Sequence, residues 1–266
     1  MLQALELSAE AHAALQRHAI QRGIIFLSSP FDRESVDLLD QLGVPAFKVG
    51  SGEVTNLPLL EHVARKGRPV ILSTGMCFLS EVKRAVDVVK EKECALALLQ
   101  CVTNYPAAPS DANLRAMKTM ADAFDVPVGY SDHALGNEVS LAAVALGACI
   151  IEKHFTLDRG LPGPDHKASL EPAELRSLVQ GVRAVESALG TGEKVPAAAE
   201  SDTREKARRS LATGVAVPKG AVVTLQMLTL LRPGTGIPPT ETEGVVGKSV
   251  TRDLPAGHLL TWEDFS

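Results

Sequence analysis

The sequence predicts an α/β protein, a (β/α)8 TIM-type barrel followed by a small β-rich module. Short apolar runs alternate with helical stretches through the first 190 residues, and the composition changes after that point. Strict alternation of strand and helix is typical of parallel sheets that are covered by helices. Buried parallel strands are expected at residues 24–29, 46–49, 69–73, 95–101, 127–130 and 149–153.

Helices are expected before, between and after these strands. The first follows Ser8, a residue type that caps helix N-termini, and ends at Gly23. The last begins at Pro172, a favoured first-turn residue, carries leucines and valines three and four apart, and ends at Gly190. The expected helices are residues 8–22, 33–43, 56–66, 79–91, 111–124, 136–147 and 172–189.

The number of strand–helix units favours a barrel. Residues 24–190 hold six units of roughly 28 residues, so eight units would need roughly 220, close to the usual barrel size of about 250. The chain begins with a helix, which fits entry at the second helix of a barrel. We therefore expect strands three to eight of a barrel whose first two strands are missing from this chain. An open, doubly wound six-stranded sheet is the alternative.

The chain is expected to divide into three parts. Residues 1–190 form the partial barrel, residues 191–208 are a polar linker, and residues 209–266 form the β-rich module. Within the module, residues 217–228 and 254–265 share the positions of a proline, a glycine and a threonine. This internal repeat predicts a duplicated hairpin with Pro-x-Gly turns.

Composition excludes several classes of protein. The chain has 266 residues, of which 45% are apolar and 22% charged, an ordinary globular mixture. It has no apolar run of about 18 residues and no signal peptide pattern, so we expect a cytoplasmic protein without a membrane partner. The net charge of −5 comes without a basic stripe, which argues against nucleic acid. The four cysteines form no CxxC pair and are expected to be reduced.

Polar side chains gather where the predicted strands end. The carboxyl ends of parallel strands share one rim, where ligands bind in such folds. A serine in this position can instead be a simple helix cap. Lys48 is harder to explain that way, because a lysine that ends a buried strand must direct its charge into a water-filled mouth. The candidate residues at this rim are Ser29, Lys48, Ser51, Glu53, Ser73, Thr103, Tyr105, Ser131, His133 and His154.

Two histidines suggest a metal. His133 and His154 follow consecutive strands, which lie about 5 Å apart in a parallel sheet, so both imidazoles can reach one ion. With no cysteine and few carboxylates nearby, the set suits Mn²⁺ or Mg²⁺ acting as a Lewis acid better than structural zinc. Taken separately, each histidine could be a hydrogen-bonded structural residue.

Several motifs together carry a family resemblance. They are FLSSPFD, FKVGSGE, ILSTGM, LLQCVTNYP, VGYSDHALG, IIEKHFTLDR and GPDHKASLEP, in this order. The series resembles the N-acetylneuraminate (sialic acid) synthase family over the barrel, and RRSL with LRPGTGI resembles that family's C-terminal SAF (antifreeze-like) domain. The resemblance implies condensation of phosphoenolpyruvate with N-acetylmannosamine or a related amino sugar, release of phosphate, and a divalent metal. It also implies a homodimer in which the SAF domain acts in trans.

The resemblance assigns phosphoenolpyruvate contacts to residues of this sequence. Lys48 and Ser51 of FKVGSGE would hold the carboxylate and the phosphate. Ser29, Ser73 and Ser131 resemble further hydroxyl contacts to phosphoenolpyruvate.

The same resemblance places the sugar and the metal. Glu53, Tyr105 and Asp165 would contact the sugar, and the two strand-end histidines would bind the metal. Arg232 resembles the SAF arginine that reaches the sugar's N-acetyl group in the partner's site. Thr103 stands where the family more often has a phosphate-contacting asparagine or serine.

Other interpretations stay open at this stage. The family's first two strands carry an acid and a lysine that are not in this sequence, so the chain is expected to be a truncated form or a non-catalytic binding or oligomerisation remnant. A synthase of a related nonulosonic acid, legionaminic or pseudaminic acid, is another possibility. A lysine-based aldolase could use Lys48 or Lys153 as its nucleophile. In the metal mechanism, both lysines are expected to stabilise the departing phosphate.

Overall fold

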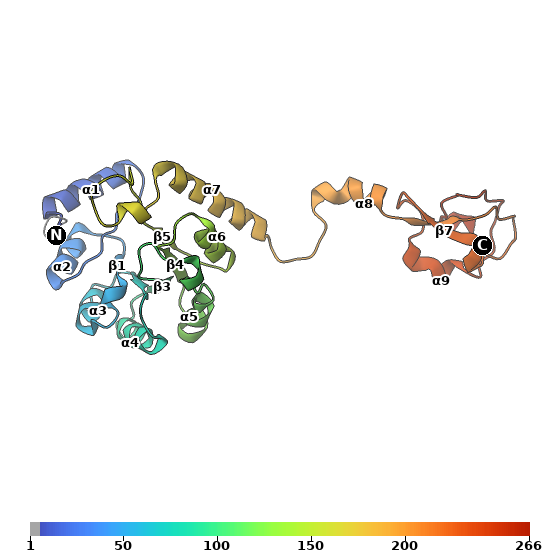
Figure 1. Cartoon of the computed structure of the whole chain (residues 1–266). Coiled ribbons are helices and arrows are strands. Elements are labelled where there is room, and N and C mark those ends of the chain that lie inside the picture. Colours follow the sequence, from blue (N-terminus) through green and yellow to red (C-terminus); the bar gives the residue numbers. More distant parts are fainter. Residues whose placement is uncertain (1–5) are drawn as a thin grey trace. The chain divides into compact units, whose positions relative to one another are not determined.

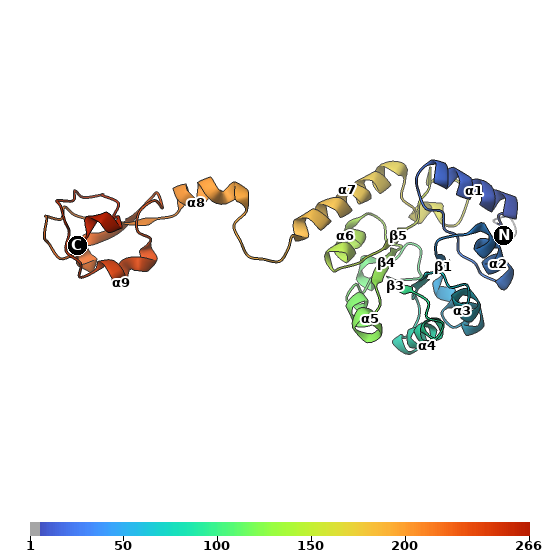
Figure 2. The same ribbon diagram turned by 180° about the vertical axis from the view of Figure 1, so that it is seen from behind.

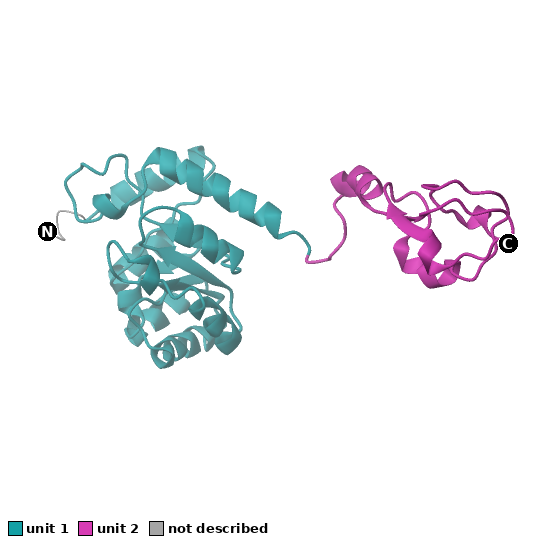
Figure 3. Ribbon diagram, turned by 45° about the vertical axis from the view of Figure 1, so that its right-hand side comes forward, with its two compact units in different colours: residues 1–191 teal, residues 192–266 magenta. Residues whose placement is uncertain are grey.

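The computed structural model describes residues 6–266. The chain divides into two compact units, residues 1–191 and residues 192–266 (Figure 3). Each unit has its own buried apolar cluster.

The first unit is built on a parallel sheet. Its strands lie in sequence order, and each pairs in parallel with the next. The register sets Lys48 opposite Ile71 and Ser131 opposite Glu152. Figure 1, and Figure 2 from behind, show the strands at the centre of the unit with helices around them. The strands are β1 (Phe47–Val49), β2 (Val70–Ser73), β3 (Leu96–Cys101), β4 (Val128–Asp132) and β5 (Ile151–Lys153).

The helices follow the expected order. Ser8 caps the first, accepting a hydrogen bond from the backbone N–H of Ala11 at 3.2 Å. Gly43 ends the second in the left-handed conformation. The helix expected at 111–124 begins only at Ala116, after a short 3-10 turn. The helices are α1 (Ala9–Gln21), α2 (Arg33–Leu42), α3 (Leu57–Ala64), α4 (Leu79–Lys90), α5 (Ala116–Phe124), α6 (Glu138–Ala145) and α7 (Pro172–Leu189).

The core lies on the helix side of the sheet. Alternate strand residues such as Phe47, Val49, Leu72, Leu98 and Tyr130 are fully buried there. Because side chains alternate across a strand, the residues between them face the opposite side, where the polar groups lie. Each large apolar side chain buried in this way stabilises the fold by about 1.5–3 kcal/mol.

The segment 24–29 is not a strand, so the prediction of six strands was wrong by one. Ile24 and Ile25 are 64% and 74% exposed. Residues 25–31 make no backbone hydrogen bond with the described part of the chain. Phe26 packs partly against the core. An apolar, β-branched run indicates that a segment is suited to a ladder, but not that a hydrogen-bonding partner lies beside it.

The second unit contains an antiparallel pair, β6 (Ser210–Thr213) and β7 (Leu228–Leu231). Part of the segment expected to be a linker forms the helix α8 (Ser201–Ala207). A short helix, α9 (Thr242–Val245), contributes Val245 to the unit's core.

The repeat in the second unit is real, but its two copies pair with each other. Val217 bridges to Leu254, the residue 37 positions later, with reciprocal backbone hydrogen bonds of 2.8 Å. Val222 bridges to Ser249, and Leu259 bridges to Ala212. The two bridges are equivalent, because Leu259 lies 37 residues after Val222 and Ser249 lies 37 residues after Ala212. Each copy was expected to form its own hairpin. The bridge before each Pro-x-Gly turn joins the two copies, and the bridge after each turn runs to the segment that precedes the other copy, so neither copy forms a hairpin of its own.

Among the described residues, no helix is both long and apolar enough to cross a bilayer. Cys77, Cys94, Cys101 and Cys149 are free thiols.

Candidate functional site

A cavity of about 460 Å³ lies at the carboxyl ends of the strands of the first unit. Residues from every strand end of the sheet reach it, as does the segment before α2. The sheet therefore brings together most of the residues that the sequence singled out. The predicted residues that line it are Ser29, Lys48, Ser51, Ser73, Thr103, Tyr105, Ser131, His133 and His154.

Lys48 points into this cavity, as predicted. Its Nζ donates to Ser73 Oγ at 2.9 Å and lies 3.4 Å from Glu152 Oε1. Ser73 Oγ is in turn 3.5 Å from Glu152 Oε2. The lysine side chain is 12% exposed and that of Glu152 39%, so water and ligands can reach the pair. The arrangement places a positive charge and a hydroxyl donor side by side in a partly shielded pocket.

Glu152 is a site residue that the sequence reasoning missed. It comes two positions before His154, and residues two apart on a strand face the same side of the sheet. The inward direction of His154 was therefore the available signal for Glu152. Both residues line the cavity.

Lys153 has a different role from the one expected. Its Nζ donates to Asp132 Oδ2 at 2.7 Å and to the backbone carbonyl of Ala134 at 2.6 Å. The two charged side chains are only 4% and 0% exposed. Asp132 also accepts from Ser140 Oγ at 2.6 Å. Lys153 also borders the cavity, but its ammonium is held in this buried pair. The pairing argues against the expectation that it stabilises departing phosphate or acts as a Schiff-base nucleophile.

The loop after β2 approaches the cavity closely. The backbone N–H of Gly75 donates to Ser51 Oγ at 2.9 Å. A Cβ at Gly75 would lie 2.2 Å from Thr103 Oγ1 and 3.1 Å from Cys101 Sγ, so only glycine fits here without movement. Ser51 is thereby fixed as an acceptor, while its own proton meets only the Cys101 sulfur, at 3.8 Å.

The two histidines come together as expected. Their ring centroids are 5.2 Å apart, and the ring of Tyr105 lies 4.1 Å from His133 and 5.3 Å from His154. His133 Nδ1 lies 2.6 Å from the carbonyl oxygen of Val102, a partner that can only accept. The proton is therefore assigned to Nδ1, which leaves the Nε2 lone pair free.

The surroundings move the pKa values of the two rings in opposite directions. Burial lowers the pKa of His154, and the neighbouring His133 lowers it further. Burial also acts to lower the pKa of His133, but hydrogen bonds to Cys101 and to the Val102 carbonyl outweigh it and raise the pKa overall.

These two rings fit a divalent ion as a pair of nitrogen ligands. Within residues 6–266, no group of three or more histidine, cysteine, aspartate or glutamate side chains is arranged to hold a metal. The free Nε2 of His133 suits a metal bond, with the Val102 carbonyl holding the tautomer. Such an ion would need oxygen ligands from water or substrate, which matches the preference of Mn²⁺ and Mg²⁺.

Three of the predicted residues do not line the cavity. Glu53 accepts a hydrogen bond from Asn56 Nδ2 at 2.7 Å. Asp165 is exposed, with Oδ2 3.9 Å from His154 Nδ1. Arg232 is an exposed residue of the second unit.

Comparison with known proteins agrees with this division of the chain. The model of the NeuB family matches residues 1–194, and that of the SAF domain matches residues 208–266. The N,N'-diacetyllegionaminic acid synthase of Legionella pneumophila is 50% identical over 99% of this chain and 75% of its own length. The human N-acetylneuraminate-9-phosphate synthase is 43% identical over 92% of this chain and 69% of its own length.

A solved structure is similar in both fold and sequence. The crystal structure of N-acetylneuraminic acid (sialic acid) synthetase from Leptospira borgpetersenii, in complex with citrate, has a TM-score of 0.71 and 40% identity. The similarity covers 74% of this chain and 70% of that one. From the family match, the identity to these synthases and the shared fold, it follows that the chain belongs to the NeuB family and ends in a SAF domain.

Proposed function

We propose that the chain is a carbon–carbon bond-forming transferase of the cytoplasm, which condenses phosphoenolpyruvate with an N-acetylated amino sugar. The products are a nonulosonic acid and phosphate. The carrying observation is that Lys48, Ser73, Ser131 and two histidines meet in one cavity of a NeuB-family fold. Relatives that share this sequence are themselves synthases of such acids.

The relatives favour a legionaminic-type product over N-acetylneuraminate. The sequence analysis put N-acetylneuraminate first and legionaminic acid among the alternatives. The Legionella synthase of N,N'-diacetyllegionaminic acid is 50% identical, against 43% for the human N-acetylneuraminate-9-phosphate synthase. We therefore propose an amino sugar with two acetylated nitrogens as the preferred substrate.

The inner face of the sheet supplies the contacts for phosphoenolpyruvate. The ammonium of Lys48 attracts its negative charges, and the hydroxyls of Ser51, Ser73 and Ser131 donate to its oxygens. Ser29 adds another hydroxyl from the segment before α2. Glu152 pairs with the ammonium of Lys48, so phosphoenolpyruvate must either displace the Glu152 carboxylate or bind the ammonium beside it.

The reaction balances without an external reductant or oxidant. Phosphoenolpyruvate C3 attacks the sugar aldehyde, and the new bond leaves positive charge at C2. Water adds to C2, phosphate departs with its bridging oxygen, and the former aldehyde oxygen ends as a hydroxyl. A Mn²⁺ or Mg²⁺ ion held by His133 and His154 would polarise the aldehyde when bound. Lys48 stabilises the negative charge on the departing phosphate.

The sugar is assigned to the outer part of the cavity. Tyr105 lies against both histidine rings, so its hydroxyl and ring face the reacting aldehyde. Thr103 offers a hydroxyl near the phosphate, and Asp165 lies near His154 at the margin. We propose that Glu53 reaches the sugar by releasing Asn56.

The test is a turnover assay with paired substrates. The chain is incubated with phosphoenolpyruvate, Mn²⁺ and either N-acetylmannosamine or a 2,4-diacetamido sugar, and phosphate release and product mass are followed. We expect product with the diacetamido sugar and loss of turnover in EDTA, restored by Mn²⁺. Binding of phosphoenolpyruvate without turnover on any amino sugar would instead identify a binding protein.

The lysine-based aldolase predicts a different result in a simple experiment. Borohydride with pyruvate would trap a covalent adduct on Lys48. The proposed mechanism gives no adduct, because Lys48 acts as a charge and not as a nucleophile.

We also propose that the chain works as a homodimer in which the SAF domain acts in trans. Phe31, which lines the cavity, is 67% exposed, and the exposed Leu135 and Phe155 follow His133 and His154 closely in the sequence. Exposed apolar side chains of this kind are suited to docking against another protein surface. Arg232, whose planar guanidinium suits an amide oxygen, would reach the sugar's N-acetyl group in the partner's site.

Mixing two inactive variants tests the trans arrangement. Turnover is measured for the Arg232→Ala protein alone, for the His133→Ala protein alone, and for a mixture of the two. If the domain acts in trans, a mixed dimer holds one site with both defects and one with neither, so turnover returns on mixing. If Arg232 serves its own subunit, every site keeps one defect and no activity returns.

A further inference from the structure

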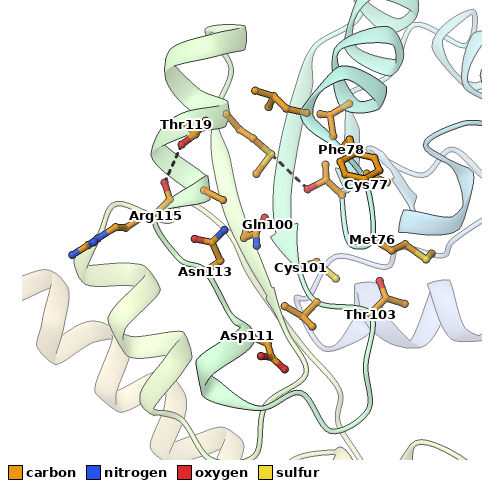
Figure 4. Close-up of a pocket in the computed structure, with 16 residues that line it drawn as sticks. Met76, Cys77, Phe78, Gln100, Cys101, Thr103, Asp111, Asn113, Arg115 and Thr119 are labelled. Atoms are coloured by element: carbon orange, nitrogen blue, oxygen red, sulfur yellow. Dashed lines mark hydrogen bonds between the residues drawn. The ribbon is translucent and has the colours of Figure 1, made fainter.

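A second cavity lies beside the catalytic one. It measures about 640 Å³ and is formed between α4 and α5, with the end of β3 at its floor (Figure 4). Cys101 and Thr103 border both cavities. No other residue assigned to the catalytic site lines this groove, so it has no role in the proposed reaction.

The two walls of the groove differ in character. One carries Met76, Phe78 and Leu79, which are unusually exposed for apolar residues; Phe78 is 78% exposed. Figure 4 shows Asn113 and Gln100 on the opposite side, with Asp111 toward one end. The groove thus sets an aromatic and aliphatic surface against amides and a carboxylate.

The polar wall has unused hydrogen-bonding capacity. Gln100 donates its Nε2 to the carbonyl of Ala112 at 3.1 Å, which leaves its Oε1 free. The carboxamide of Asn113 makes no hydrogen bond with any described residue. The carboxylate of Asp111 receives only a 3.3 Å contact from Ser110 Oγ. These groups can therefore accept from and donate to a ligand.

Both walls are held by residues with left-handed backbone conformations. Met76 has φ 54° and Asn113 has φ 44°. This backbone region is uncommon for residues other than glycine. Asparagine can stabilise it with a local side-chain hydrogen bond, whereas methionine cannot. Such conformations gather at ligand sites, where the surrounding structure maintains them.

A thin partition separates the groove from the catalytic cavity. It is the contact between Gly75 and Thr103, where no Cβ fits. A ligand in the groove would thus lie next to the loop that follows Ser73 of β2 and the loop that carries Tyr105.

We propose that this groove is a second binding site for an N-acetylated amino sugar, outside the catalytic cavity. The identity of the sugar rests on the proposed function. The groove suits a neutral ligand, because Asp111 repels anions and Figure 4 shows the guanidinium of Arg115 pointing away from the other labelled side chains. Amides pair with an acetamido group, the carboxylate accepts sugar hydroxyls, and Phe78 covers the apolar face of the ring.

Methionine side chains provide the measurement. Met76 and Met120 line the groove, Met120 from the buried core; Met117 is in the core without lining the groove, and Met227 is in the second unit. The full chain is labelled with ¹³C at the methionine methyl groups and titrated with N-acetylmannosamine without phosphoenolpyruvate. Single Met→Leu variants assign the resonances. We expect saturable shifts of Met76 and Met120 while Met227 stays unchanged.

Two variants separate this groove from the catalytic cavity. The double variant Asn113→Gly/Phe78→Ala removes one of the amides and the aromatic ring, and glycine tolerates the left-handed backbone at position 113. It should weaken binding roughly tenfold or more. Tyr105→Ala, in the part of the catalytic cavity that is assigned to the sugar, should leave the groove shifts intact. Mannose, which lacks the acetamido group, should bind more weakly by a similar factor.

The results distinguish this inference from the proposed function. Absent shifts at Met76 and Met120, or shifts that persist unchanged in the double variant, would overturn the groove assignment even if turnover is observed. Shifts abolished by Tyr105→Ala would place the sugar in the catalytic cavity and also overturn it. Groove shifts lost only in the double variant support the second site, whether or not the turnover assay succeeds.

Discussion

The two faces of the sheet in the first unit use lysine–carboxylate pairs in opposite ways. On the inner face, Lys48 and Glu152 are 3.4 Å apart and remain open to the cavity. On the outer face, Lys153 and Asp132 are 2.7 Å apart and almost fully buried. Asp132 receives further hydrogen bonds from the hydroxyl of Ser140 and the N–H of Ala134.

The difference lies in how completely each charge is satisfied. A fully hydrogen-bonded buried pair has no capacity left for a ligand, and removing one partner leaves an uncompensated charge in a dry environment. A looser, partly exposed pair contributes little to stability but can exchange its partner for a substrate. Adjacent lysine and glutamate residues of one strand thus serve structure and ligand binding respectively.

The largest expected effect comes from breaking the outer pair. Lys153→Met should lower the free energy of unfolding by about 3–5 kcal/mol, because Asp132 is left buried and unpaired. Urea denaturation followed by circular dichroism measures this. The matched control is Lys118→Met, which removes an exposed i,i+4 pair with Asp122 and should cost less than about 0.5 kcal/mol. Equal effects of the two substitutions would remove the distinction between the faces.

Breaking the inner pair should affect activity and leave the fold intact. Lys48→Ala should reduce turnover by roughly 100-fold or more, because the anionic substrate loses its main cation. The unfolding free energy should change by less than about 1 kcal/mol, since the pair is partly exposed. Steady-state kinetics and urea denaturation on the same preparation measure both. A large loss of stability with little loss of turnover would reverse the comparison.

A buried carboxylate in the second unit offers a parallel case to the outer pair. Asp264 has no exposed surface and accepts hydrogen bonds from Arg252 at 2.7 Å, from His258 at 2.9 Å and from the N–H of Thr261 at 2.9 Å. Burial acts to raise its pKa, but the Thr261 N–H, Arg252 and His258 outweigh burial and lower the pKa to about 2.

This pKa gives the second unit an acid-sensitive stability. Since the folded-state pKa lies below the ordinary value of 3.8, the stabilisation is complete above pH 3.8 and is lost as the pH falls toward 2. Its size is about 2 kcal/mol. Trp262, the single tryptophan of the chain, reports on this unit by fluorescence during urea unfolding. Asp264→Asn should flatten the dependence between pH 4 and 2, and an unchanged slope would show that other groups cause it.

The smallest expected effect concerns the carboxylate of the inner pair. Glu152→Gln should tighten the binding of phosphoenolpyruvate by roughly tenfold, because a negative charge that competes for Lys48 is removed. Isothermal titration calorimetry measures the affinity directly. Weaker binding in the variant would mean that Glu152 positions Lys48 for the substrate and does not compete with it.

Much of the fold could be predicted because the strands and helices carry local signals. The apolar runs that became β1 to β5 are each followed by polar residues, and the helix caps at Ser8, Gly43 and Gly190 are residue types with known preferences. The segment 24–29 has the same apolar composition, but hydrogen-bond pairing is a property of its neighbours and not of its own residues.

The sequence predicted which residue types form the site more readily than the side of the sheet that each side chain faces. Lys48 and the two histidines were found as polar residues at strand ends. Lys153 was placed with them, although adjacent strand residues face opposite sides and His154 already occupied the inner one. Applying the two-residue period would have selected Glu152 instead. The groove of Asn113 and Phe78 carries no such period, because its lining comes from α4, β3, α5 and the loops before the two helices, which only the folded chain brings together.

The crossed pairing of the repeat in the second unit has a consequence for synthesis of the chain. Val217 needs Leu254, and the N–H of Thr213 needs the carbonyl of His258. Val250 bridges to Phe265, the penultimate residue. These hydrogen bonds can therefore form only after the segment about 40 residues further along the chain has been synthesised, whereas β6 and β7 can pair earlier.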